Sequence, residues 1–161
     1  MIRRMPPLPL HGPDATEALG RRLAGGLRAG DALLLSGPTG AGKSLLARAL
    51  IRAAQSDAGQ VPEDVPSPTY TLVQTYRAGP LEIWHADLYR LTSSDELWEL
   101  GLAEAFDHAA CLIEWPDRLG PDRPQAAVEI ALSVGAEDDT RIAQISGPAG
   151  MLDRLAQGLA A

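Results

Sequence analysis

The stretch Gly37–Ser44 constrains this chain more than any other. It reads G-P-T-G-A-G-K-S and satisfies each fixed position of the phosphate-loop pattern G-x-x-x-x-G-K-[ST]. Glycines let such a backbone curl until several N–H groups point at phosphate oxygens, and the helix that follows offers its positive N-terminal end to the same anion. The pattern predicts an ATP site in which Lys43 contacts the β and γ phosphates and Ser44 binds Mg²⁺.

The residues on both sides of this loop fit the prediction. Ala32–Leu35 is a short apolar run typical of a buried parallel strand, and Leu45–Ile51 has apolar residues at helical spacing. Lys43 is the only lysine of the chain, because every other basic side chain is arginine. A compact ammonium at this one position indicates a task that a planar guanidinium cannot perform. An ordinary glycine-rich turn is the alternative, and the flanking pattern argues against it.

Length and composition predict one domain over residues 1–161 of an ordinary globular protein, with 45% hydrophobic and 22% charged residues. No apolar run approaches the ~20 residues that cross a bilayer, and the proline-rich N-terminus lacks the apolar core of a signal peptide, so we expect a cytoplasmic protein. The net charge of −7, with no basic run longer than a pair, argues against a chain that holds nucleic acid by itself. Cys111 is the only cysteine and excludes an internal disulfide.

Local patterns predict the secondary structure. Residues 1–13 are expected to be irregular, although Ile2 or Met5 could add an edge strand. A first helix is predicted to start with Asp14 as its N-cap and Glu17 as its capping-box partner. The remaining expected elements are a surface loop at 55–66, strands at 67–76, 81–86, 109–114, 127–134 and 141–146, a helix from Ser94 interrupted at Gly101, and a C-terminal helix at 149–159. We expect two antiparallel hairpins, 67–76 with 81–86 and 127–134 with 141–146.

Two acidic residues end predicted strands. Glu114 closes the apolar run 109–114 and is expected at the sheet edge that carries the phosphate loop, where it would bind Mg²⁺; a surface acid before the turn at Pro116 is the alternative. Asp87 ends the strand before it. Together the two carboxylates could hold the metal and position the attacking water.

For the hydroxyl-bearing and aromatic residues near these acids, the sequence gives weaker indications of a functional role. Thr69 and Thr71 are candidates for a segment that senses the γ-phosphate, and plain strand threonines are an equal alternative. A structural role is favoured over a catalytic one for His85. Trp115 is interpreted as a packing or lid residue.

Several motifs occur together and in order: Gly37–Ser44, Ser67–Val73, His85–Leu91, Glu99–Leu102 and Cys111–Pro116. In this combination, from about Thr16 to about Leu119, the chain resembles the TsaE (YjeE) family, the P-loop ATPases of bacterial tRNA threonylcarbamoyladenosine biosynthesis. The resemblance implies an α/β fold, a small three-layer P-loop domain with a mostly parallel central sheet and antiparallel edge strands. It also implies ATP and Mg²⁺ as ligands. The implied partners are the TsaD and TsaB proteins, with tRNA reached only through that complex.

Residue by residue, the resemblance assigns Thr39, Gly40, Ala41, Gly42, Lys43 and Ser44 to the phosphates. It assigns Ser44 and Glu114 to Mg²⁺, and Asp87, Lys43 and Glu114 to catalysis. Thr140 and Arg141 are candidates for adenine contact, and Pro13 and Asp14 are further candidates. The chain departs from the family at Pro38-Thr39, where Asp-Leu is usual, and at Ser44, where Thr is usual; neither change removes a needed group, because the loop binds through its backbone and either hydroxyl can ligate Mg²⁺.

Two other functions share the phosphate loop. A kinase for a small metabolite would be expected to carry an arginine-rich lid, but only Arg118 and Arg123 follow Glu114 closely. A non-catalytic nucleotide switch is the other, and the lack of an N-K-x-D pattern argues against GTP. No arginine adjoins Glu114 or the Thr69 segment, and Arg90 is the nearest candidate, so the isolated chain is predicted to hydrolyse ATP slowly until a partner completes the site.

Overall fold

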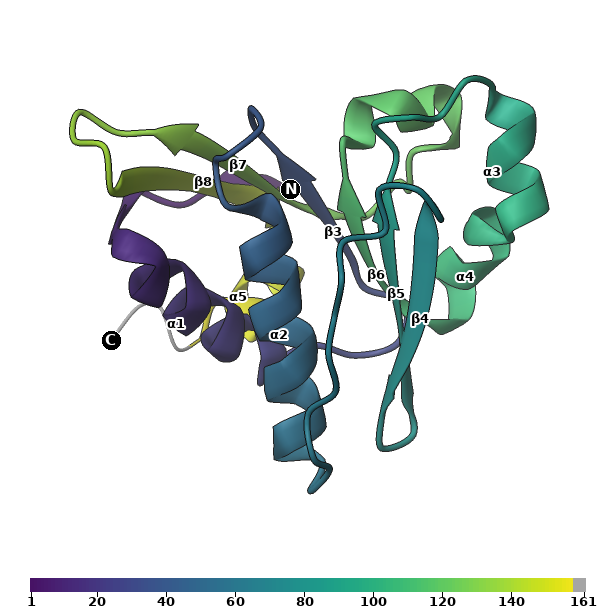
Figure 1. Cartoon of the computed structure of the whole chain (residues 1–161), viewed down its shortest axis with the longest axis horizontal. Coiled ribbons are helices and arrows are strands. Elements are labelled where there is room, and N and C mark those ends of the chain that lie inside the picture. The colour runs from purple at the N-terminus through teal and green to yellow at the C-terminus, as the bar shows by residue number, and fades with distance from the viewer. Residues whose placement is uncertain (158–161) are drawn as a thin grey trace.

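A single mixed sheet forms the centre of the molecule (Figure 1). The structure, a computed structural model, describes residues 1–157, except for the side chain of Ser94. The strands are β1 (Ile2–Arg4), β2 (Leu8–His11), β3 (Ala32–Ser36), β4 (Val73–Ala78), β5 (Leu81–Asp87), β6 (Ala110–Glu114), β7 (Val128–Val134) and β8 (Thr140–Pro148). Their order is β1-β8-β7-β3-β6-β5-β4, and β2 also pairs with β8.

The strands at the middle of this sheet are parallel and those at its edges are antiparallel. β7, β3, β6 and β5 run in one direction, whereas β8 pairs with β7 and β4 pairs with β5 in the opposite sense. Both predicted hairpins are therefore present. The expected α/β fold with a parallel centre and antiparallel edges is confirmed.

Helices cover both faces of the sheet (Figure 1). They are α1 (Gly12–Ala24), α2 (Lys43–Asp57), α3 (Ser94–Leu100), α4 (Leu102–His108), the 3₁₀ helix η1 (Pro116–Asp122) and α5 (Ala149–Leu155). Side chains of a strand alternate between its faces. Accordingly Leu33 and Leu35 of β3 pack in the cluster that contains α1, α2 and α5, whereas Leu34 packs in the cluster that contains α3 and α4.

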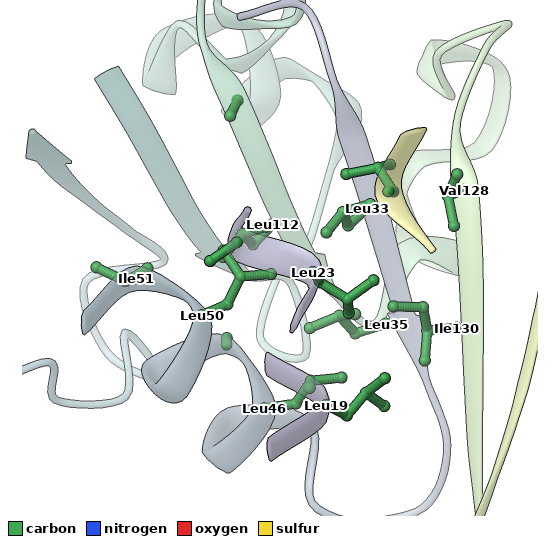
Figure 2. Close-up of a cluster of buried hydrophobic side chains, with 14 of the residues drawn as sticks. Leu19, Leu23, Leu33, Leu35, Leu46, Leu50, Ile51, Leu112, Val128 and Ile130 are labelled. Atoms are coloured by element: carbon green, nitrogen blue, oxygen red, sulfur yellow. The ribbon is translucent and has the colours of Figure 1, made fainter. Parts of the chain in front are cut away.

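The first of these clusters fixes α1 and α2 against the sheet. Leu19 and Leu23 of α1 meet Leu46 and Leu50 of α2 over Leu35 (Figure 2). Each of these five side chains is at most 2% exposed, and burying a leucine contributes about 1.5–3 kcal/mol. This packing holds the start of α2, and with it the phosphate loop, against the C-terminal end of β3.

The N-terminal prediction was wrong in two respects, although β1 confirms the alternative of an edge strand at Ile2. Residues 1–13 are not irregular as a whole, because β1 and β2 both pair with β8, whose edge would otherwise present unpaired backbone groups. α1 begins at Gly12 after His11, and no side chain caps it. Asp14 therefore lies inside the first turn and does not serve as the N-cap, since Pro13 supplies the fixed φ that suits a helix start.

The predicted surface loop at 55–66 also begins too early. α2 continues to Asp57, and Gln55 is completely buried although glutamine is usually exposed. Its Nε2 donates to Glu63 Oε2 at 2.6 Å and to the Arg77 carbonyl at 3.2 Å. Partners distant in sequence thus satisfy a side chain whose polarity alone indicated the surface.

Other boundaries shift by a few residues. Ser67–Leu72 forms turns, and β4 starts only at Val73. Gly101, at φ 79°, separates α3 from α4 as predicted. The predicted C-terminal helix begins at Ala149, but α5 ends at Leu155, earlier than the expected end at Leu159, a residue that lies outside the described part of the chain. No helix in the described part of the chain has the length and apolarity needed to cross a membrane.

Candidate functional site

The phosphate loop lies between β3 and α2. Gly37, Gly40 and Gly42 have φ values of 136°, 86° and 104°, in the region that favours glycine. A Cβ on Gly37 would lie 2.2 Å from the Leu132 carbonyl oxygen, so only glycine fits there. Gly42 is the N-cap of α2 and brings no side chain to the first-turn amides. No side chain occupies these amides, which is what a phosphate cradle requires.

Lys43 is buried beside this loop. Its Nζ donates to the Gly37 carbonyl at 2.6 Å and the Pro38 carbonyl at 3.1 Å, and it lies 4.3 Å from the centre of the Trp115 ring. Burial lowers the pKa of Lys43 from its usual value, and the nearby carboxylates oppose that shift. The ammonium is thus held by two neutral carbonyls and the face of a ring. An anionic phosphate would attract it more strongly than these partners do.

Strand pairing brings the two acids together. β5 and β6 are parallel with Asp87 opposite Glu114, so both carboxylates emerge at the same sheet edge. Glu114 is 2% exposed, and its two oxygens have different partners: Oε1 accepts from Ser44 Oγ at 2.9 Å, and Oε2 lies 2.7 Å from His85 Nε2. Because a carboxylate only accepts, we assign the proton to Nε2 of His85. The predicted structural histidine therefore orients a predicted metal ligand.

Asp87 has a separate set of partners. Its Oδ1 accepts from the Tyr89 backbone N–H at 3.1 Å, and its Oδ2 accepts from Thr69 Oγ1 at 3.3 Å. Thr69 in turn is 2.9 Å from Ser67 Oγ. Thr71 instead accepts from Gln74 Nε2 at 3.0 Å. Of the two threonines considered from the sequence, the structure brings only Thr69 to the acids.

These groups surround one cavity of about 430 Å³. It is lined by Thr39, Gly40, Gly42, Lys43, Ser44, Leu45, Ser67, Thr69, Asp87, Tyr89, Glu114 and Trp115. Sequence reasoning did not single out Tyr89 as a lining residue. The signal was its position two residues after Asp87, where the chain leaves the strand.

Two aromatic rings close one side of the cavity. Trp115 has φ 59°, an uncommon value for a bulky residue, and such backbone strain is found at functional sites. The rings of Trp115 and Tyr89 are 5.0 Å apart between centroids, and the Arg118 guanidinium lies 6.0 Å from the Tyr89 ring. The backbone at Trp115 thus turns the indole over Lys43.

A second depression of about 290 Å³ adjoins the loop on its other side. It is lined by Gly12, Pro13, Thr16, Gly40, Ala41, Gly42, Leu45, Asp139 and Arg141. Arg141 Nε donates to the Gly40 carbonyl at 3.2 Å. Two of the predicted adenine candidates, Arg141 and Pro13, therefore line this depression. Thr140, which is buried against His11, and Asp14 do not line it.

The site fits a Mg²⁺–nucleotide complex. Ser44 and Glu114 offer hard oxygen ligands side by side, and Mg²⁺ commonly takes one or two protein oxygens and completes its shell with phosphate and water. Within residues 1–157 no group of three or more His, Cys, Asp or Glu side chains forms a self-sufficient metal site. A metal here would therefore be bound together with its phosphates.

Comparisons with known proteins agree with the motifs. The family model described as "Threonylcarbamoyl adenosine biosynthesis protein TsaE" matches residues 10–143. Relatives described as "tRNA threonylcarbamoyladenosine biosynthesis protein TsaE" include one from Rickettsia bellii, 33% identical over 137 residues (85% of this chain, 92% of the relative), and one from Bacillus subtilis, 31% identical over 131 residues (81% and 78%). A relative with the same description from Mycobacterium bovis is 36% identical over 139 residues (81% and 80%).

A solved structure supports the fold. The crystal structure of Bacillus subtilis YdiB superposes with a TM-score of 0.74 and covers 99% of this chain and 96% of its own, at 24% sequence identity. At 24% identity, the similarity to this structure supports the fold of the chain and nothing beyond it.

Proposed function

The chain belongs to the TsaE family of threonylcarbamoyl adenosine biosynthesis proteins, and from this premise we propose that it binds and hydrolyses ATP during formation of threonylcarbamoyladenosine on tRNA. The observation that carries the proposal is a phosphate loop and two strand-borne carboxylates around a single cavity. The further parts of the proposal are the roles of single residues and the partner proteins.

The phosphates would lie on the backbone of Thr39–Ser44. Positive φ values at Gly40 and Gly42 curl the loop, and α2 adds the positive end of its dipole. Lys43 Nζ needs only to exchange the Gly37 and Pro38 carbonyls for phosphate oxygens. Arg141 and Pro13 line the adjoining depression, which is where the nucleoside would extend.

Ser44 and Glu114 would hold Mg²⁺. When bound, the ion draws the phosphate oxygens together and neutralises part of their charge. His85 fixes the orientation of Glu114 through its 2.7 Å contact, in the way that outer partners commonly orient metal ligands.

Asp87 would orient the attacking water. Its carboxylate is held by Thr69 and by the Tyr89 N–H and borders the same cavity as Lys43. In the reaction, a water oxygen forms a bond to the γ-phosphorus while the bond to the β,γ-bridging oxygen breaks. One proton of the water moves to a phosphate oxygen or to solvent, and the products are ADP and phosphate. Asp87 holds that water by accepting its hydrogen bond.

Among the described residues, none of those that line the cavity is an arginine. The guanidinium of Arg90 instead lies 4.6 Å from the exposed ring of Tyr70. An arginine at the transferred phosphoryl group is worth a factor of about 10³ or more. We therefore propose slow hydrolysis by the isolated chain and stimulation by TsaD and TsaB, with tRNA contacted through those partners.

Phosphate release tests this proposal in three reactions: the chain alone, the chain with purified TsaD and TsaB, and the chain with tRNA alone. We expect slow release alone, faster release with the proteins, and no effect of tRNA. Fast release by the chain alone would contradict the partner dependence. Stimulation by tRNA without the proteins would move the RNA contact to this chain. Thermal stabilisation by ATP but not GTP, with no hydrolysis under any condition, would instead favour a non-catalytic switch.

A further inference from the structure

A groove with an excess of positive charge lies on the outer side of α1 and α2, which run side by side in Figure 1. It has a volume of about 300 Å³. Its charged lining residues are Arg21 and Glu17 from α1 and Arg48 and Arg52 from α2. Three arginines against one glutamate stand out in a chain whose net charge is −7. We call this surface the arginine groove.

The spacing of these residues makes the groove continuous. Arg48 and Ala49 lie three and four residues after Leu45, and Arg52 and Ala53 lie four residues after Arg48 and Ala49, so these residues form one stripe along α2. Their small and apolar members provide the floor and the arginines provide the rim.

A close contact between α1 and α2 brings Arg21 of α1 to the groove that the arginines of α2 line. Gly20 of α1 packs so tightly on α2 that an added Cβ would lie 2.9 Å from the Ala49 Cβ and 3.0 Å from the Leu46 carbonyl. Arg21, the next residue, lines the same groove as the arginines of α2.

Arg48 and Arg52 are oriented by hydrogen bonds, and no ion pair neutralises an arginine of the groove in the described residues. Arg48 Nε donates to the Val65 carbonyl at 3.1 Å, and Arg52 donates to the Glu63 carbonyl at 2.5 Å, which leaves further N–H groups on each guanidinium. Ion pairs in the described part of the chain engage other arginines, such as Arg154 with Asp31 at 2.6 Å, and none of the three in the groove. Like charges at i and i+4, as at Arg48 and Arg52, disfavour a helix when nothing compensates them. Compensation by a partner would account for their presence.

We propose that the arginine groove binds an acidic segment of a partner protein, with carboxylates on the arginine rim and an apolar side chain on the floor of Ala49 and Ala53. A nucleic-acid strand fits less well, because it needs a longer basic track and would meet the acidic remainder of the surface. Leu45 lines both this groove and the cavity of the phosphate loop, so a bound segment would lie beside Ser44. The inference rests on the proposed function for its expected partners, TsaD and TsaB, which would contact this chain at the arginine groove.

Charge reversal with a matched control tests the proposal. The test variant carries Arg21→Glu, Arg48→Glu and Arg52→Glu, and the control carries Arg4→Glu, Arg22→Glu and Arg28→Glu, the same change in net charge at exposed positions elsewhere. The probes are purified TsaD–TsaB and a synthetic helical peptide with glutamates on one face and valines on the other. We expect the test variant to bind both probes about ten- to hundredfold more weakly and the control to change by less than about threefold.

Two further variants guard against loss of folding. The triple Arg→Lys variant keeps the charge and should bind within about threefold of the parent. Arg21→Glu alone alters no hydrogen bond found in the described structure and should weaken binding by about threefold. Thermal stabilisation by ATP should be the same in all variants, because none of these arginines borders the phosphate loop.

The outcomes separate this inference from the proposed function. Binding of the peptide but not of TsaD–TsaB, still sensitive to the arginines, would support the groove and contradict the proposed partners. Equal binding of the test variant and the parent, or binding of neither probe by the parent, would overturn the groove. So would tRNA binding that the three arginines control, since that would make the occupant an RNA.

Discussion

Replacing His85 tests whether the buried pair with Glu114 supports the site. In His85→Leu, Glu114 Oε2 loses its partner at 2.7 Å while the carboxylate stays buried, since the two side chains are 1% and 3% exposed. Losing a hydrogen bond to a buried charged group costs about 1.5–3 kcal/mol. For a domain of this size that corresponds to a fall in Tm of about 3–12 °C. The measurement is thermal unfolding followed by circular dichroism.

Two matched variants separate this pair from a general histidine effect. His85→Gln keeps a donor at about the same reach and should recover part of the lost stability. His108→Leu removes a surface histidine, 54% exposed and 3.4 Å from Glu82, and should cost less than about 0.5 kcal/mol. A His85→Leu variant as stable as His108→Leu would refute the reasoning.

A double-mutant cycle localises the effect. In a Glu114→Gln background the carboxylate charge is absent, so His85→Leu should cost clearly less than in the parent chain, with a coupling of about 1–3 kcal/mol. If the proposed metal role of Glu114 holds, His85→Leu should also weaken the Mg²⁺ dependence of ATP binding by about 10- to 100-fold. Costs that add within about 0.5 kcal/mol would show that the 2.7 Å contact contributes nothing specific.

The remaining predictions concern the proposed ligand groups and the single cysteine. Lys43→Ala and Lys43→Arg should both abolish ATP binding, measured by calorimetry. Lys43→Ala should leave Tm nearly unchanged, because burial lowers the pKa of Lys43 and its ammonium therefore adds little to the stability of the folded state. Glu114→Ala should weaken Mg²⁺-dependent binding, whereas Asp87→Asn should keep ATP bound and slow turnover; equal loss of binding in both would show that the two roles are divided wrongly. Burial raises the pKa of Cys111 to about 12, so at pH 8 its thiol should react with iodoacetamide only through unfolding, and mass spectrometry should show slower alkylation when ATP and Mg²⁺ are present.

The sequence predicted the parts of the fold whose signals are local. Ala32–Leu35 and the run that ends at Glu114 are apolar throughout, and only buried parallel strands of that length fit beside a phosphate loop. Gly101 separated two helices because a positive φ suits glycine. Once strand and loop were identified, the position of Glu114 at the ligand edge followed from the geometry of parallel sheets.

The features that sequence reasoning missed depend on partners far along the chain. β1 and β2 form because β8 extends from Thr140 to Pro148 and offers them an edge, whereas residues 1–13 indicated at most one edge strand, at Ile2 or Met5. Gln55 is buried because Glu63 and the Arg77 carbonyl meet its amide. Neither the strands at the N-terminus nor the burial of Gln55 can be predicted from the local composition of the sequence.

The distinction between Thr69 and Thr71 has a similar cause. Leu72, at φ 68°, turns the backbone, and its N–H donates to the Pro68 carbonyl at 2.7 Å, which closes a turn around the two threonines. The turn directs Thr69 to Asp87 and leaves Thr71 with Gln74. A pattern that favoured an extended strand from residue 67 could not separate them, since a turn with positive φ at leucine is uncommon.

The two acids at the sheet edge are therefore coupled to different parts of the molecule. Glu114 is tied to Ser44 at the start of α2 and to the buried His85, both in elements fixed by the core. Asp87 is tied through Thr69 to a turn outside the sheet, and its own N–H donates to the Leu72 carbonyl at 2.9 Å. Any partner that shifts the turn would change the contacts of Asp87 and leave those of Glu114 intact. If Glu114 and Asp87 have the proposed roles, this arrangement favours regulation of turnover without loss of Mg²⁺ binding.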